Sequence, residues 1–399
     1  AESCLKRLAP RVMSKAAPDV DLQERGLPRL AVGVGLVGIA IYYVQGWLSS
    51  SSTDATDEAV DSSSASVVST VFSLLWVLVK LFSALVLMLL GMLVLRQRSI
   101  LYCPTPPGMK RSTKENPAGY RSPEMWRVPF EEVWIETEDK VKLNSWLVYQ
   151  PIADLTEAPF TFVFFHGNAG NIGFRLENLR DMHQQLKANI LIVEYRGYGD
   201  SEDGPGPCQQ GFIKDAVAAY RWLVEYATNP PEAAKTRIGA EKLLIFGRSI
   251  GGAVGLHLFH HLLKDKVENK SPTPLPAGIV LENTFTSLRD MALTMFPFLA
   301  PLRPILRPPL IFDPWNSAEC LDYICSHTDD WCVCLFSGAL DEIVPPAQMK
   351  QLHTILKAKR PRVLKFFSIP TGGHNDTHSK GGHDYWESFR KFLVLVGES

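Results

Sequence analysis

The sequence predicts an α/β domain, a mostly parallel, doubly wound sheet with helices on both faces, preceded by apolar segments near the N-terminus. Short apolar runs alternate with segments of helix length from about residue 133 onward, and this alternation indicates a parallel sheet. Ahead of them, residues 67–95 are apolar with few interruptions, a length and composition typical of a membrane-spanning helix.

Length and composition narrow the class of protein. The chain has 399 residues, 46% hydrophobic and 21% charged, with a formal net charge of -1, which accommodates one large domain and an appended segment. The balanced charge provides no basis for binding nucleic acid, so none is expected as a partner, and neutral or amphiphilic substrates fit better.

The seven cysteines are scattered. Cys332 and Cys334 would share one face of a strand, so reduced thiols are expected rather than disulfides.

Two apolar segments precede the globular part. Residues 30–48 are apolar and Gly-rich but only marginally long for a spanning helix. Residues 67–95 are a stronger case, because Lys80 is their only charged residue. A lysine near the bilayer centre costs roughly 2.5 to 3.5 kcal/mol, whereas each Leu, Val or Phe returns about 0.3 to 0.6 kcal/mol. We therefore expect a transmembrane segment at 30–48 and a transmembrane helix at 67–95. A buried core helix is the alternative for the second.

Charges around these segments predict their orientation. The tail 1–29 and the linker 96–127 contain Lys and Arg, whereas the polar loop 49–66 contains acidic residues and neither Lys nor Arg. Because positive charge favours the cytosolic side, the pattern predicts a hairpin with both ends in the cytosol. The globular domain, residues 128–399, would then be cytosolic, on an endomembrane or the plasma membrane. If the first segment does not span, or is cleaved off, the charges no longer satisfy this rule, and the domain would lie on the opposite side.

Within the globular domain, an antiparallel hairpin precedes the alternating strands and helices. The hairpin is expected because a short polar turn separates two alternating runs. The expected strands are residues 133–137, 141–149, 160–165, 190–193, 243–246, 279–281, 332–336 and 363–368, and the helices include 174–187, 211–226 and 252–263. An edge hairpin followed by a wound sheet is the order of the α/β-hydrolase fold.

The pattern Gly-x-Ser-x-Gly occupies residues 247–251, between an expected strand and an expected helix. A serine in a tight turn between strand and helix is the arrangement of a nucleophile. Glycines flank it because its backbone is strained and a side chain on either side would collide with the neighbouring elements. We therefore predict that Ser249 is the nucleophile, with helix N-terminal amides that favour negative charge on a substrate oxygen.

His166 and Gly167 directly follow an apolar strand, which is where such folds place the first donor to an oxyanion. We expect the backbone N–H of Asn168 to be this donor. The N–H of Ile250, the residue after the nucleophile, is the expected second donor. His166 is interpreted as a buried residue that holds the loop, and not as the catalytic base.

A serine hydroxyl needs a base to take its proton, and the base needs a carboxylate to orient it, in the chain order Ser, acid, His. Asp341 lies in a loop just after an expected strand, and His374 lies in a glycine-rich loop after the next one. We predict Asp341 as the acid and His374 as the base. The alternatives are Glu342 for the acid and His378 or His383 for the base.

Several stretches together resemble the BEM46 family. They are residues 164–173 (FFHGNAGNIG), 194–199 (EYRGYG), 244–254 (LIFGRSIGGAV), 282–287 (ENTFTS), 341–346 and 374–377 (HNDT). The resemblance implies an α/β-hydrolase fold, an N-terminal membrane anchor and a triad of Ser249, Asp341 and His374. Related families include enzymes that remove palmitate from protein cysteines, so an acyl thioester is a candidate substrate by analogy. The two apolar segments depart from the family, which implies one.

Residues 283–315 are apolar and Pro-rich, and we interpret them as a small lid. Three roles are open for it: lining an acyl pocket, lying on the bilayer, or packing against the sheet edge.

Asn269 and Asn375 each begin a glycosylation sequon. A glycan on Asn375 would crowd the predicted base, which favours a cytosolic domain or an unused sequon.

The sequence therefore predicts a membrane-anchored serine hydrolase that cleaves a carboxylic ester or thioester and needs no metal or organic cofactor. Its expected partners are the lipid bilayer and an acyl ester or thioester substrate, which includes an acylated protein. Two alternatives stay open: a serine peptidase that uses the same site, and a catalytically idle membrane scaffold.

Overall fold

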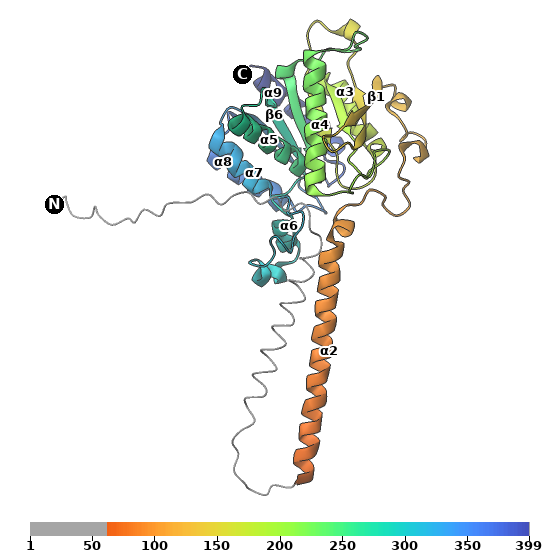
Figure 1. Cartoon of the computed structure of the whole chain (residues 1–399). Coiled ribbons are helices and arrows are strands. Elements are labelled where there is room, and N and C mark those ends of the chain that lie inside the picture. The colour runs from red at the N-terminus through yellow and green to blue at the C-terminus, as the bar shows by residue number, and fades with distance from the viewer. Residues whose placement is uncertain (1–61, 399) are drawn as a thin grey trace, which may run out of the picture. The chain divides into compact units, whose positions relative to one another are not determined.

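The computed structural model describes residues 62–398 (Figure 1). The expected tail 1–29, the expected transmembrane segment 30–48 and most of the polar loop lie outside the described residues. The chain divides into two units, Ala1–Ser83 and Ala84–Ser399. The sheet lies in the second, and we call its described part, residues 84–398, the sheet unit.

Helix α2 spans Ser62–Leu101 and is longer than the expected 67–95. Residues 62–66, expected in the polar loop, and 96–101, expected in the linker, are helical. The Ser and Ala residues at one end and the long side chains at the other are compatible with helix. The helix stops shortly before Pro104, because proline lacks an N–H and disfavours helix in the residue before it.

By length and composition, Thr70–Leu101 within α2 can cross a membrane, and an 18-residue stretch within it has a mean hydropathy of 2.6. It is the only such helix in the described part of the chain. No residue in its most apolar stretch is buried. The alternative of a buried core helix therefore does not describe this segment.

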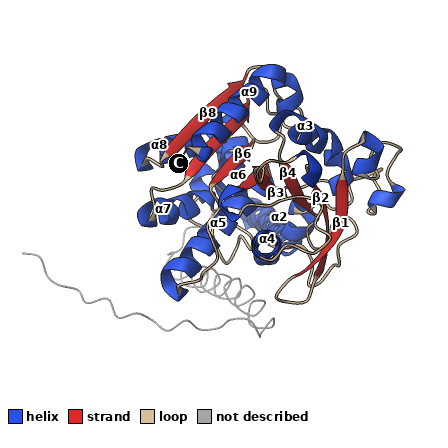
Figure 2. Ribbon diagram, turned by 90° about the horizontal axis from the view of Figure 1, so that it is seen from above, coloured by secondary structure: helices blue, strands red, loops and turns tan. Residues whose placement is uncertain are grey.

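Eight strands form one sheet in the order β1-β2-β4-β3-β5-β6-β7-β8 (Figure 2). The strands are β1 (Phe130–Glu136), β2 (Lys142–Val148), β3 (Thr161–Phe165), β4 (Asn189–Val193), β5 (Leu243–Arg248), β6 (Gly278–Glu282), β7 (Cys332–Gly338) and β8 (Val363–Ile369). β2 pairs antiparallel with β1 and with β4, and every other pairing is parallel. The predicted α/β-hydrolase fold is confirmed.

Helices cover both faces of the sheet (Figures 1 and 2). They are α3 (Leu176–Leu186), α4 (Gln209–Thr228), α5 (Ile250–Asn269), α7 (Ser317–His327), α8 (Pro346–Lys359) and α9 (Thr377–Gly397), whereas α6 (Leu288–Met295) lies below the sheet in Figure 1. In β3, Val163 and Phe165 pack with residues of α4, α5, α7 and α8, whereas Phe162 and Phe164 pack with residues of α3 and α9. Successive strand side chains point to opposite faces, so one strand contributes to both cores.

The parallel strands bring their carboxyl ends to one edge of the sheet. Phe165 at the end of β3 pairs with Gly247 in β5, and Gly338 at the end of β7 pairs with Ile369 at the end of β8. The loops that follow these strands therefore lie together. They contain the predicted nucleophile, oxyanion loop, acid and base.

Candidate active site

Ser249 lies in the turn between β5 and α5 with φ 55° and ψ -125°, a backbone region that is costly for a residue with a Cβ. A Cβ on Gly251 would overlap the carbonyl oxygen of Phe165, and a Cβ on Gly247 would overlap the backbone of Gly251. The Ser249 N–H donates to the carbonyl oxygen of Glu282 at 2.9 Å. Close packing thus explains both glycines, and the bond to β6 holds the serine at the sheet edge.

His374 and Asp341 form a buried pair. His374 Nδ1 lies 2.8 and 3.0 Å from the two carboxylate oxygens of Asp341, and the two residues are 5% and 8% exposed. The backbone N–H groups of Ile343 and Val344 donate to the same carboxylate at 2.9 and 2.8 Å. A carboxylate held in this way orients the imidazole and leaves Nε2 available to accept a proton.

The alternative residues lie differently. Glu342 accepts a hydrogen bond from the backbone N–H of His374 at 3.2 Å, and not from its ring. His378 is buried, its ring nitrogens have no hydrogen-bond partner among the described residues, and burial lowers its pKa to about 3. His383 is 78% exposed and lies 3.3 Å from Glu387. Of these histidines, His374 is the one whose ring contacts the predicted acid.

Arg248 joins the serine turn to the histidine loop, and Asn283 joins the end of β6 to the same loop. Arg248 Nη2 donates to the carbonyl oxygen of His374 at 3.0 Å, and Asn283 Nδ2 donates to the same oxygen at 3.1 Å. The Arg248 guanidinium also lies 3.3 Å from the carboxylate of Glu282.

Within residues 62–398, no hydrogen bond joins the Ser249 hydroxyl to the His374 ring. In sites without substrate, such bonds are often long and tighten only in the complex.

Sequence reasoning did not single out Arg248 or Asn283. Two signals were present: Arg248 is a charged residue at the end of an apolar strand, and Asn283 is a polar residue directly after another. Both are almost fully buried, at 3% and 1% exposure. A buried polar side chain must find partners to offset its desolvation, and here the partners are the loops of the site.

The amides predicted to hold an oxyanion are unpaired. In the described part of the chain, the backbone N–H groups of Asn168 and Ile250 donate to no acceptor. The Ile250 amide is the first of α5, where no acceptor exists within the helix. A Cβ on Gly167 would lie 3.5 Å from the Cβ of Ser249, so the two loops are in contact. Unpaired amides beside a serine are the arrangement expected of an oxyanion hole.

The side chain of Asn168 attaches this loop to the end of α2. Its amide donates to the carbonyl oxygen of Leu101. Its carbonyl oxygen accepts from the Cys103 N–H at 3.3 Å and from the Tyr198 hydroxyl at 2.8 Å. The Gly170 N–H also donates to the Cys103 carbonyl oxygen at 3.3 Å. Leu101 at the end of α2 and Cys103 just after it therefore help to position the loop that contains Asn168.

His166 is fully buried. Its Nε2 lies 3.2 Å from the carboxylate of Glu194, and its Nδ1 lies 2.8 Å from the carbonyl oxygen of Gly167. The Tyr195 hydroxyl donates to the carbonyl oxygen of His166 at 3.0 Å. These contacts fix the position of the loop that contains His166 and Asn168.

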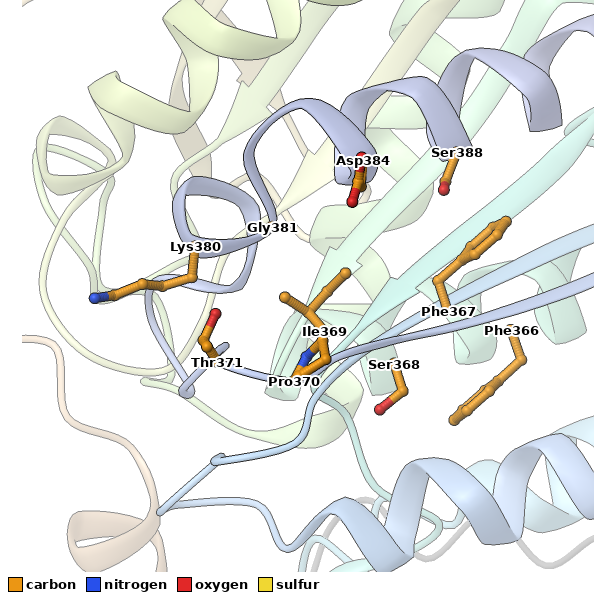
Figure 3. Close-up of a pocket in the computed structure, with 10 residues that line it drawn as sticks. All are labelled: Phe366, Phe367, Ser368, Ile369, Pro370, Thr371, Lys380, Gly381, Asp384 and Ser388. Atoms are coloured by element: carbon orange, nitrogen blue, oxygen red, sulfur yellow. The ribbon is translucent and has the colours of Figure 1, made fainter.

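A hollow of about 350 Å³ lies between β8 and α9 (Figure 3). Its lining residues are Phe366, Phe367, Ser368, Ile369, Pro370, Thr371, Lys380, Gly381, Asp384 and Ser388. None of them is a predicted site residue, so this hollow is separate from the site.

Within residues 62–398, no group of three or more His, Cys, Asp or Glu side chains is arranged to hold a metal ion.

Solved structures of similar shape include esterases. An esterase of Pyrococcus furiosus is 16% identical with a TM-score of 0.48, covering 69% of this chain and 94% of its own. A carboxyl esterase of Tuber melanosporum is 14% identical with a TM-score of 0.48, covering 67% and 88%. No protein-family model matches the chain. The fold assignment therefore depends on the strand order of the chain itself.

Curated relatives match most of the chain. An alpha/beta hydrolase domain-containing protein of Arabidopsis thaliana, WAV2, is 35% identical over 319 residues, which cover 78% of this chain and 92% of the relative. Protein bem46 of Schizosaccharomyces pombe is 32% identical over 311 residues, covering 78% and 90%. An uncharacterized membrane protein of Saccharomyces cerevisiae is 30% identical over 276 residues, covering 69% and 84%. With this fold, and with this identity over nearly the full length of its relatives, the chain belongs to the BEM46 family of α/β-hydrolase-fold proteins.

Proposed function

We propose that the protein is a membrane-anchored serine hydrolase that cleaves carboxylic esters or thioesters. The observation that carries the proposal is the buried contact between His374 and Asp341, at the same sheet edge as Ser249 on its strained turn. A base oriented by a carboxylate is what converts a serine hydroxyl into a nucleophile. Two contacts support the proposal, because Arg248 joins the serine turn to the histidine loop and Asn283 joins the end of β6 to the same loop.

In the proposed reaction, His374 Nε2 takes the hydroxyl proton of Ser249 as Oγ attacks the carbonyl carbon. Asp341 stabilises the imidazolium through Nδ1–H, and the amides of Asn168 and Ile250 donate to the oxyanion. The tetrahedral intermediate then breaks its bond to the alcohol or thiol, which leaves with the proton from His374. Water, deprotonated by His374, attacks the acyl-serine, the bond between the acyl carbon and Oγ breaks, and His374 returns the proton to Oγ, which releases the carboxylic acid and restores the serine.

The proposed substrate class is a fatty-acyl ester or thioester on a lipid or a protein. The apolar lid, residues 283–315, follows β6 directly, and an apolar lid favours an amphiphilic substrate. The thioester is included by analogy with related families that remove palmitate from protein cysteines.

We also propose that α2 anchors the protein in a membrane, with the globular domain, residues 128–398, in the cytosol. Thr70–Leu101 has the required length and hydropathy, and a yeast relative is named as a membrane protein. Arg96 and Arg98 follow the apolar stretch directly, which favours the cytosolic side for that end.

The proposal is tested by labelling the full chain in membranes with a fluorophosphonate, a probe that reacts with activated serines. Ser249→Ala is the test variant, and Ser326→Ala, at an exposed serine on α7, is the matched control. The same proteins are assayed on short and long acyl esters, acyl thioesters and peptide amides. We expect labelling and turnover of an ester or thioester in wild type and Ser326→Ala, and neither in Ser249→Ala.

Thermal unfolding of the three proteins separates chemistry from folding. Ser249→Ala is expected to unfold at the wild-type temperature, because removing one hydroxyl from the turn leaves its backbone bonds in place. A folded wild-type protein that is not labelled and cleaves none of the panel would replace the proposal with the idle scaffold. Cleavage of peptide amides in preference to esters and thioesters would replace it with the peptidase.

A further inference from the structure

The segment that we call the lid segment, residues 294–310, exposes a continuous set of apolar side chains. Of its residues, only Leu299 and Leu306 are half-buried, and the rest are exposed. Its large exposed side chains, between 43% and 76% exposed, are Met295, Phe296, Phe298, Leu302, Ile305 and Leu310. Soluble surfaces rarely leave apolar patches of this kind uncovered, so the segment is suited to contact with a partner.

The charge of the lid segment narrows the kind of partner. Arg303 and Arg307 are its only charged residues, and both are exposed. Arg303 is 63% exposed and lies 3.6 Å from Asp290 of α6. Apolar side chains interspersed with arginine are typical of segments that lie in the interfacial layer of an anionic membrane, where arginine meets phosphate and the apolar groups enter the acyl region.

Two residues in the last turns of α2 hold the C-terminal end of the lid segment. Gln97 Nε2 donates to the carbonyl oxygen of Leu310 at 2.9 Å, and Gln97 Oε1 accepts from the Phe312 N–H at 2.8 Å. Arg98 pairs with Asp313 at 2.8 Å, and its guanidinium lies 5.8 Å from the ring centre of Phe312. The lid segment is therefore attached to the helix that is proposed to enter the bilayer.

The position of this attachment along α2 sets the depth of the lid segment. Gln97 comes two residues after Leu95, the last residue of the apolar stretch, and a helix rises about 1.5 Å per residue, so it lies about 3 Å beyond that stretch. The interfacial layer on each side of the hydrocarbon core is about 5 to 7.5 Å thick. The attachment at Leu310 therefore falls within the interfacial layer when α2 spans the bilayer.

We propose that the lid segment lies in the interfacial layer of the phospholipid bilayer that α2 crosses, with Phe298 and Ile305 among the acyl chains. This inference rests on the membrane anchoring proposed above. The lid segment begins ten residues after Thr284, whose hydroxyl donates to the carbonyl oxygen of Ser249 at 2.7 Å. A short stretch of chain therefore connects the segment proposed to contact the bilayer to the turn of the proposed nucleophile.

The test places the photoreactive residue p-benzoylphenylalanine at single positions of the full chain. The proteins are reconstituted in vesicles of phosphatidylcholine and phosphatidylserine that contain radiolabelled phosphatidylcholine. Phe298 is the test position. Leu89 in α2, 51% exposed, is the control for the anchor, and Val394 in α9, 57% exposed, is the control for an apolar side chain away from the lid. Figure 1 shows α6 below the sheet and the C-terminus near the upper end of the sheet.

After irradiation, we expect lipid adducts at Phe298 to exceed those at Val394 at least fivefold, with adducts at Leu89 also present. Adducts at Leu89 with none above the Val394 level at Phe298 would overturn the lid inference and leave the anchor in place. Absence of adducts at both Leu89 and Phe298 would overturn the anchor and this inference together. A protein adduct at Phe298 in cell membranes, without a lipid adduct, would assign the segment to a protein partner instead.

Discussion

Arg248 Nη2 donates a hydrogen bond of 3.0 Å to the backbone carbonyl oxygen of His374. The residue before the proposed nucleophile thus holds the loop of the proposed base. We predict that Arg248→Met lowers kcat about 100-fold, the effect of misplacing a catalytic group by about 1 Å, with a smaller change in KM. Steady-state kinetics on the ester or thioester found by the substrate panel measures both.

A second substitution separates this positioning role from stability. Arg248→Met leaves the buried carboxylate of Glu282 without its charged partner, while the Tyr385 hydroxyl still donates to it at 2.6 Å, and we expect the free energy of unfolding to fall by up to about 3 to 5 kcal/mol. The double variant Arg248→Met/Glu282→Gln also removes the unpaired charge. We therefore expect it to regain part of the free energy of unfolding while its kcat stays low. If kcat also returned, Arg248 would act through folding alone.

His374→Ala is predicted to lower kcat by about 10⁴-fold or more, the effect of removing the catalytic base from known serine hydrolases. His378→Ala is predicted to change kcat less than tenfold, because the His378 ring has no hydrogen-bond partner among the described residues. Asp341→Asn and Glu342→Gln form a second matched pair, and only the first is expected to cause a large loss. The reverse result in either pair would reassign the base or the acid.

Asn168→Ala is predicted to lower kcat between about 10-fold and 100-fold. The side chain holds the oxyanion loop through Leu101, Cys103 and Tyr198, and misplacing one oxyanion donor costs up to about 10² to 10³ in kcat. Tyr198→Phe removes one of these bonds and should have a smaller effect. Equal kcat in Asn168→Ala and wild type would show that the attachment to the end of α2 does not position the donor.

Burial lowers the pKa of His378 to about 3, and the charge of Arg248 adds to this effect. An unfolded histidine titrates near pH 6.5, so between pH 6.5 and about 3 the unfolded state binds a proton that the folded state does not. The free energy of unfolding therefore falls as pH falls through this window, by about 1.4 kcal/mol per unit. Above pH 6.5 this group contributes no pH dependence.

His378→Leu is accordingly predicted to reduce the loss of stability between pH 7 and pH 5 by about 2 kcal/mol. Denaturant unfolding of the full chain in detergent at the two pH values measures the difference. His383→Leu is the control, because His383 is 78% exposed. An unchanged pH dependence in His378→Leu would show that this histidine is not buried in its neutral form.

The fold was accessible from sequence because its signals are local. Strand-length apolar runs, the hairpin turn and the pattern around Ser249 each depend on a few adjacent residues, and the strand order confirms the predicted fold. The ends of α2 could not be predicted from the sequence. Residues 62–66 and 96–101 have the polar composition of loops, although the structure places them in the helix. The segment 30–48 lies outside the described residues, and its span and the cytosolic orientation stay predictions.

The sequence by itself determined the strand and helix order, the glycine-flanked serine turn and the loops in which an acid and a base must be sought. Only the tertiary structure decided that Asp341, and not Glu342, contacts the ring of His374, and that Arg248 holds its loop. The physical reason is distance along the chain. These contacts join loops that lie far apart in sequence, and only the parallel strands of a folded sheet bring their carboxyl ends to one edge.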